Sequence, residues 1–333
     1  MSKILQVENL VQEFDLTHDL LDRIKFKKGR FTMERQVVHA VNNVSFDVET
    51  GEVFSLVGES GCGKSTTART AIRLQEPRSG KILFEGKDIT HISQKELRPI
   101  RRQIQMIFQD PYASLNPRQK IRDILVEPIL FHGLASSRKE AADKAVYLLE
   151  RVGLSAEQAN RYPHQFSGGQ RQRIGIARAL AVEPKFIIAD EPVSALDVSI
   201  QAQIINLFSR LQRQLGLTYL FIAHDLAVVR HIADRVGVMY LGHLVEIMDA
   251  DELYRHPMHP YTRALLSAVP ITDYYAERSR QREVLAGEVP SPIHAPTGCP
   301  FHPRCPRATE ACRRVMPELT DRGGGHLVAC HND

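Results

Sequence analysis

The sequence predicts an α/β protein in which helices cover a largely parallel β-sheet. Short apolar runs alternate with helical patterns between residues 53 and 223, which is typical of strands joined by crossover helices. A glycine-rich stretch, Gly58–Thr66, separates an apolar run from a helical pattern. The composition then changes near residue 250, and ten of the 18 prolines lie from Pro257 to Pro317. We therefore expect a large domain over residues 1–250 and a smaller C-terminal region over residues 251–333.

The composition is that of an ordinary soluble protein. Hydrophobic residues make up 43% of the 333 residues, and no apolar run approaches the roughly 18 residues of a membrane-spanning helix. The N-terminal segment Met1–Gln6 lacks the shape of a secretory signal. We therefore expect a cytosolic protein, unless a partner holds it at a membrane. The net charge of +4 is too small to argue for binding to nucleic acid.

The expected elements before the glycine-rich stretch are mostly strands. Leu5–Leu10 alternates weakly and predicts an edge strand, whereas residues 25–35 are polar and predict a hairpin or loop. Residues 39–48 alternate and predict a strand, and Val53–Val57 is the apolar run that enters the glycine-rich stretch.

The glycine-rich stretch matches the pattern G-x-x-x-x-G-K-S at Gly58, Gly63, Lys64 and Ser65. Glycines let backbone N–H groups close around an anion, and the following helix adds its positive N-terminus. Lys64 would bridge β- and γ-phosphate oxygens, and the Ser65 hydroxyl would bind Mg²⁺. The alternative is a glycine-rich turn with a chance lysine. The residues expected to bind phosphate are Gly58, Glu59, Ser60, Gly61, Cys62, Gly63, Lys64, Ser65 and Thr66.

Strands and helices then alternate. The expected strands are residues 81–84, 104–108, 186–189 and 218–223, and the expected helices lie mostly within residues 121–154, from 166 to about 180, and over 200–215. Residues 110–118 predict a loop because of their prolines. Within residues 138–152, apolar residues fall on one stripe of a helix.

Two further patterns indicate nucleotide chemistry. Asp190 and Glu191 follow the apolar run 186–189, where one carboxylate can hold Mg²⁺ and the other can polarise water, although such a pair also occurs on ordinary surfaces. Ser167-Gly168-Gly169 offers a hydroxyl and glycine N–H groups at a helix N-terminus. A second phosphate cradle in one domain suggests a γ-phosphate supplied by another protomer. The alternative is an ordinary helix start.

Six motifs in this order resemble those of the ABC-transporter ATPase family. They match its phosphate loop, Q-loop, signature loop, metal-acid strand, D-loop and switch histidine at Gly58–Ser65, Gln109, Phe166–Gln170, Ile187–Glu191, Ser194–Asp197 and His224. The resemblance implies a RecA-like core with an antiparallel β subdomain and a helical subdomain over about 110–180. It also implies a head-to-tail dimer that sandwiches two ATP molecules.

The resemblance also implies roles for individual residues. Glu191 resembles the general base, and His224 resembles the group that contacts the γ-phosphate. Gln109 resembles the Mg²⁺ and water sensor that links to the transmembrane subunits, and Asp197 resembles the D-loop residue. The implied Mg²⁺ residues are Ser65, Gln109 and Asp190, and the implied contacts to the partner's ATP are Ser167, Gly168, Gly169 and Gln170. In this family an aromatic residue a little over 20 positions before the glycine-rich loop usually stacks on adenine. Counting back from Gly58 reaches Arg35 and Gln36 here, with Phe31 nearby.

The C-terminal region narrows the resemblance. Residues 256–262 contain a His-Pro-Tyr sequence similar to that of dipeptide and oligopeptide importer ATPases, and residues 110–118, 291–292 and 298–300 are also similar. This implies a paralogous second ATPase subunit in a heterodimer, two integral-membrane permease subunits, an extracytoplasmic peptide-binding protein and no nucleic acid. The implied location is the cytoplasmic face of the inner membrane. Importers for nickel or glutathione, a soluble ATPase acting on nucleic acid, and a redox or metal protein are the alternatives.

Four of the five cysteines lie in the last 35 residues: Cys299, Cys305, Cys312 and Cys330. In a cytosolic protein such a group indicates a metal rather than disulfides. Four thiolates suit zinc or an iron–sulfur cluster, and the intervals are longer than those of usual zinc pairs. With the subfamily resemblance, this favours a structural [4Fe-4S] cluster over zinc and over four unliganded thiols.

Overall fold

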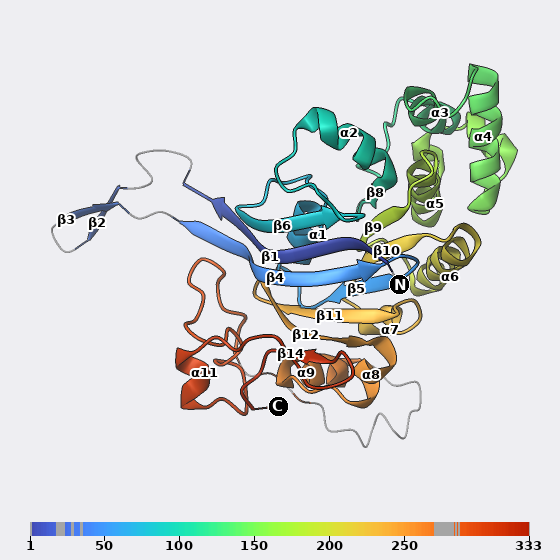
Figure 1. Cartoon of the computed structure of the whole chain (residues 1–333). Helices are drawn as coiled ribbons and strands as arrows, with labels where there is room; N and C mark the ends of the chain where they lie inside the picture. The colour runs from blue at the N-terminus through green and yellow to red at the C-terminus, as the bar shows by residue number, and fades with distance from the viewer. Residues whose placement is uncertain are drawn as a thin grey trace.

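The computed structural model describes residues 2–17, 24–27, 30–33, 36–269, 283, 285 and 287–332. Figure 1 shows three regions around a central sheet: a second sheet on one side, a helical layer at one end and the C-terminal region on the opposite side from that second sheet. Within the described ranges, none of the helices combines the length and the apolar character that crossing a membrane requires.

The central sheet has the strand order β13–β14–β12–β11–β5–β10–β9–β8. Neighbours from β11 to β8 run parallel, and β12, β14 and β13 are antiparallel. Its strands are β5 (Val53–Val57), β8 (Ile104–Ile107), β9 (Phe186–Asp190), β10 (Thr218–Ile222), β11 (Arg235–Tyr240), β12 (His243–Asp249), β13 (Thr320–Asp321) and β14 (Leu327–Val328). Every residue of β5, β9 and β10 is buried, which explains their continuous apolar sequences. The predicted parallel sheet is confirmed.

The second sheet is antiparallel, with the order β4–β1–β6–β7. Its strands are β1 (Lys3–Asp15), β4 (Val37–Glu49), β6 (Ser79–Phe84) and β7 (Lys87–Asp88), and β2 (Ile24–Lys27) pairs separately with β3 (Arg30–Met33). The prediction that Leu5–Leu10 forms an edge strand is wrong, because β1 has a neighbour on each side. Phe46 of β4 stacks on Phe54 of β5 with ring centroids 5.3 Å apart, which joins the two sheets.

The helical layer packs on the end of the central sheet at β8 and β9 (Figure 1). It comprises α3 (Ile121–Phe131), α4 (Arg138–Arg151), the 3₁₀ turns Ala156–Asn160 and Pro163–Gln165, and α5 (Gly168–Leu180). The apolar stripe predicted for residues 138–152 is buried at Ala145, Leu149 and Val152. The remaining helices of this part of the chain are α1 (Lys64–Ala71), α2 (Gln94–Gln103), α6 (Val198–Leu215) and α7 (Leu226–Val229).

The C-terminal region lies against the β11–β12 side of the central sheet (Figure 1). Its described helices are α8 (Ala250–Arg255), α9 (Pro260–Ala268) and α11 (Glu310–Arg314). Phe301 is 1% exposed and packs against Tyr240 and Tyr261, with ring centroids 5.2 and 5.4 Å away. Apolar packing on the central sheet therefore orders this proline-rich region.

Candidate nucleotide-binding site

The glycine-rich stretch forms a tight loop between β5 and α1. Gly58, Gly61 and Gly63 all have positive φ angles, of 150°, 80° and 106°. A Cβ atom would lie 2.2 Å from the Met239 carbonyl oxygen at Gly58 and 2.2 Å from the Ala40 carbonyl oxygen at Gly63. Since backbone cannot yield as a side chain can, these two positions require glycine for both space and conformation.

The Lys64 ammonium is directed back into this loop. It is 4% exposed and donates hydrogen bonds to the Gly58 carbonyl at 2.8 Å and the Glu59 carbonyl at 3.1 Å. A buried cation next to backbone N–H groups at a helix N-terminus makes the loop a site for an anion with several oxygens.

The Ser65 hydroxyl meets the end of β9. Its Oγ atom donates to Asp190 Oδ1 at 2.6 Å, and Arg69 Nη2 lies 3.0 Å from Asp190 Oδ2. Asp190 is fully buried. A hydroxyl and a carboxylate in contact are the hard oxygen ligands that Mg²⁺ prefers, so the donor set fits this ion.

Glu191 directly follows Asp190 and contacts two other predicted residues. Its Oε2 atom accepts a hydrogen bond from Gln109 Nε2 at 3.0 Å, and His224 Nδ1 lies 3.5 Å away. Glu191 adopts φ of 45°, a left-handed conformation that costs about 1–3 kcal/mol in a residue with a side chain. Three segments far apart in the sequence therefore converge on one carboxylate.

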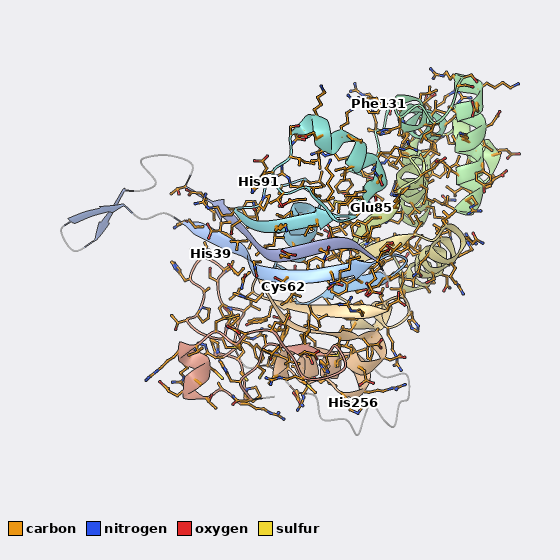
Figure 2. The ribbon with its side chains drawn as sticks, in the orientation of Figure 1. His39, Cys62, Glu85, His91, Phe131 and His256 are labelled. Atoms are coloured by element: carbon orange, nitrogen blue, oxygen red, sulfur yellow. The ribbon has the colours of Figure 1, made fainter. Side chains whose placement is uncertain are left out.

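A cavity of about 380 Å³ opens over the loop. The predicted residues that line it are Ser60, Gly61, Gly63, Lys64, Ser65, Thr66, Gln109 and Glu191. Asp190 joins them through Ser65, and His224 joins them through Glu191. Figure 2 labels His39, which belongs to β4, and Cys62 of the phosphate loop.

Phe14, His39 and Pro292 also line this cavity and were missed by sequence reasoning. Phe14 lies 44 positions before Gly58, but it pairs with Val38 in the β1–β4 register, and this pairing carries it to the loop. Of the residues considered for stacking on adenine, Arg35 and the side chain of Phe31 lie outside the described residues, and Gln36 is exposed. The strand register, rather than a count along the chain, identifies the aromatic ring at the cavity.

The signature-loop residues lie elsewhere. Ser167 caps α5: its Oγ atom accepts from the Gln170 N–H at 3.3 Å, and Gln170 Oε1 accepts from the Ser167 N–H at 3.0 Å. As far as the structure describes the chain, the lining of the cavity over the loop does not include Ser167–Gln170. Asp197 precedes α6, where its carbonyl accepts from Ile200 and Gln201.

The predicted metal site in the C-terminal region is wrong. Among the residues that the structure describes, no group of three or more His, Cys, Asp or Glu side chains is placed to hold a metal ion. The structure therefore does not support the [4Fe-4S] cluster, or zinc, on the four residues for which it was predicted: Cys299, Cys305, Cys312 and Cys330.

The thiols have other surroundings. Cys312 Sγ lies 3.3 Å from Thr309 Oγ1, and Cys330 Sγ accepts from the Asn332 N–H at 3.3 Å. Burial raises the pKa of Cys299 to about 11, so this thiol is protonated at neutral pH. The prediction failed because it assumed that the proline-rich region had no other source of order, and Phe301 supplies one.

Two family models match the chain. One, described as ABC transporter, matches residues 41–194, and the other, described as oligopeptide/dipeptide transporter C-terminal region, matches residues 245–312. A solved structure titled as the dimeric post-hydrolysis state of the ATP-binding cassette MJ0796 bound to ADP and Pi has a TM-score of 0.62 and 28% identity, over 74% of this chain and 98% of that chain. That of cbiO1 from Clostridium perfringens has a TM-score of 0.63 and 27% identity, over 77% and 92%.

Curated relatives match nearly the whole chain. The oligopeptide transport ATP-binding protein AppF of Bacillus subtilis is 55% identical, over 94% of this chain and 95% of its own length. The putative oligopeptide transport ATP-binding protein YkfD of the same organism is 54% identical, over 90% and 91%. The motif order, the fold and these matches agree: the chain belongs to the ABC-transporter ATPases, and among them to the ATP-binding proteins of the oligopeptide and dipeptide transporter family.

Proposed function

We propose that this chain is the ATP-binding subunit of an ABC importer and hydrolyses ATP to drive the uptake of dipeptides or oligopeptides. The observation that carries this proposal is the convergence of Lys64, Ser65, Gln109 and Glu191 on one cavity in a chain with an oligopeptide-transporter C-terminal region. We assign ATP hydrolysis to residues 1–250, with a helical subdomain at about 110–180, and a separate C-terminal region to residues 251–333.

The side chains around the cavity suit hydrolysis of a bound triphosphate. The loop N–H groups and Lys64 would hold the β- and γ-phosphates once the ammonium leaves its two carbonyl partners. Ser65, Asp190 and Gln109 would hold Mg²⁺, which supplies charge neutralisation at the phosphates. Glu191 would accept a proton from the attacking water, and His224 would fix the γ-phosphate relative to it.

A second protomer would complete the site. The helix N-terminus at Ser167–Gln170 offers the Ser167 hydroxyl and glycine N–H groups. Within the described residues, the lining of this chain's own cavity does not include them. We propose that they contact the ATP bound by a partner, with Asp197 beside them, and that the partner is a paralogous ATPase subunit.

The membrane partners would be two permease subunits, supplied with peptide by an extracytoplasmic binding protein. A cavity of about 640 Å³ between β8 and α3 suits such docking, because it is lined by Phe108 and Phe131, which are 39% and 62% exposed. Phe131 projects at the surface of the helical layer in Figure 2. Gln109 directly follows Phe108, which connects this surface to the catalytic cavity. The chain would thus lie peripherally on the cytoplasmic face of the membrane.

The test is purification of the native assembly followed by transport. We expect the chain to co-purify with two permeases and one paralogous ATPase, and proteoliposomes of that assembly to take up peptide only with MgATP. Two copies of this chain without a paralogue would exclude the heterodimer. ATP hydrolysis without any peptide uptake across a peptide library would contradict the importer.

A further inference from the structure

One residue of the phosphate loop, Glu59, is held by the C-terminal region through both its backbone and its side chain. The Tyr261 hydroxyl oxygen accepts a hydrogen bond from the Glu59 N–H at 2.9 Å. Arg304 donates two hydrogen bonds to the Glu59 carboxylate, from Nη1 at 2.8 Å and from Nη2 at 3.2 Å. Paired hydrogen bonds of this kind fix direction as well as distance.

The two groups that hold Glu59 are themselves fixed in place. Tyr261 is fully buried, and the Arg304 side chain is 8% exposed. Tyr261 packs edge-on against Tyr240 with centroids 4.7 Å apart, and the Arg304 guanidinium lies 5.9 Å from the Tyr240 ring centre. Burial raises the pKa of the Tyr261 phenol, so its oxygen remains a neutral acceptor. The C-terminal region therefore presents a rigid surface to the loop.

The peptide group that joins Gly58 to Glu59 is held at both ends. Its N–H donates to Tyr261, and its carbonyl accepts from the Lys64 ammonium at 2.8 Å. Gly58 has no side chain, so little restricts its ψ angle, about which this peptide would rotate. Rotation would break both hydrogen bonds and change the shape of the phosphate loop. Once ATP draws Lys64 away, the Tyr261 bond is the contact that still holds this peptide.

We propose that Tyr261 and Arg304 are positioning residues that fix the Gly58–Glu59 peptide for ATP, so that the C-terminal region sets the nucleotide affinity of the catalytic domain. This inference rests on the proposed binding of ATP at Gly58–Thr66. It gives the C-terminal region a role in nucleotide binding that requires neither a metal nor a ligand of its own.

Tyr261→Phe isolates the backbone contact, because the ring and its packing are kept. The Glu59 N–H loses its acceptor, and the cost of one hydrogen bond corresponds to about a fivefold rise in the Kd for Mg–AMP-PNP. We expect the assembled transporter to show a matching rise in KM for ATP, with kcat within about twofold of wild type. A general loss of packing would lower the melting temperature without this separation of KM from kcat.

Tyr254→Phe is the matched control. Tyr254→Phe also removes a hydroxyl bond to backbone, in this case to the Leu226 carbonyl, but the contacts of Tyr254 within the described residues are with Leu226 and Arg230 and not with the loop. Its variant should bind Mg–AMP-PNP with wild-type affinity.

The side-chain contact is tested by Arg304→Gln and Glu59→Gln, singly and together. If the pair acts as a unit, the second substitution adds little to the effect of the first on Kd. Arg314→Gln is the control, because Arg314 pairs with Glu310 in the same region, far along the chain from the loop.

The measurement is calorimetric titration of the full chain with Mg–AMP-PNP. A wild-type chain that does not bind would contradict the proposed function. A wild-type chain that binds, with Tyr261→Phe and Arg304→Gln folded and equal to it in affinity, would overturn the positioning role alone. Additive effects of Arg304→Gln and Glu59→Gln would show that the ion pair does not act on the loop.

Discussion

Gln109 Nε2 donates a hydrogen bond to Glu191 Oε2 over 3.0 Å, which ties the second residue after β8 to the residue after β9. The proposed sensor thus contacts the proposed base directly. A shift of the segment after β8 would move the Glu191 carboxylate as well, because the contact is direct. This provides a short physical route from the Phe108 surface to the site of water attack.

Glu191→Gln should retain ATP binding and lower turnover by at least about 100-fold, because the amide keeps the shape but cannot accept the proton. The measurement is steady-state ATPase activity of the assembled transporter, together with nucleotide affinity. Glu183→Gln is the control, since its carboxylate is exposed and pairs only loosely, 3.7 Å from Arg102. Near-normal turnover in Glu191→Gln would assign the base elsewhere.

Gly63→Ala should abolish nucleotide binding, whereas Gly61→Ala should weaken it modestly. Both positions have positive φ, a strain of about 1–3 kcal/mol for alanine. Only at Gly63, of the two, would the added Cβ meet backbone, 2.2 Å from the Ala40 oxygen; at Gly61 no atom of the described structure lies within 4 Å. Titration with Mg–AMP-PNP compares them, and equal losses would contradict the steric argument.

Stability should fall as the solution is acidified, in part because of His259. Burial lowers its pKa to about 3, and its Nδ1 atom accepts the Tyr261 N–H at 3.1 Å. In the unfolded chain the pKa is about 6.5. Between about pH 3 and about pH 6.5, the unfolded chain therefore carries the proton and the folded chain does not. The stabilisation is therefore complete above about pH 6.5 and is lost toward pH 3, by up to about 1.4 kcal/mol per pH unit.

Chemical denaturation at about pH 7 and about pH 5.5 measures this slope. His259→Asn should flatten it, because asparagine can still accept the hydrogen bond at the helix N-cap without titrating. His256→Asn is the control, since that side chain is 70% exposed. Identical slopes in all three proteins would mean that His259 is not held neutral.

Phe301→Ala should destabilise the C-terminal region by about 3–5 kcal/mol, because it removes the ring that packs against Tyr240 and Tyr261 and leaves a cavity. Amide hydrogen exchange should rise in residues 299–312. Phe131→Ala, which removes an exposed ring, should change stability by about 1 kcal/mol or less. Unchanged exchange in Phe301→Ala would mean that some other contact orders this region.

The residues expected at the site could be placed from the sequence because they follow strands that are easily recognised. Lys64, Gln109 and Glu191 each follow a short apolar run, and parallel strands bring their carboxyl ends to one edge of a sheet. Buried parallel strands are also the most recognisable in sequence, since both faces are apolar. These elements could be placed without knowing any long-range contact.

What could not be predicted depends on contacts between distant segments. β1 is weakly patterned because it is paired on both sides within a half-exposed antiparallel sheet, so it resembled an edge. Phe14 reaches the cavity through strand register, and Arg304 reaches Glu59 across 245 residues of chain. Cysteine count and spacing, on which the metal prediction also relied, do not tell whether four thiols are placed to share one ion.

The β14 strand covers one side of β12 through the pairs Glu246–Val328 and Ile247–Leu327. A strand edge left open exposes unpaired N–H and C=O groups to any other extended chain. Where β14 pairs with it, this edge of β12 is closed to such pairing. A chain shortened after residue 312 would uncover β12 and also deprive buried Glu246 of the His326 Nε2 atom, 2.8 Å away.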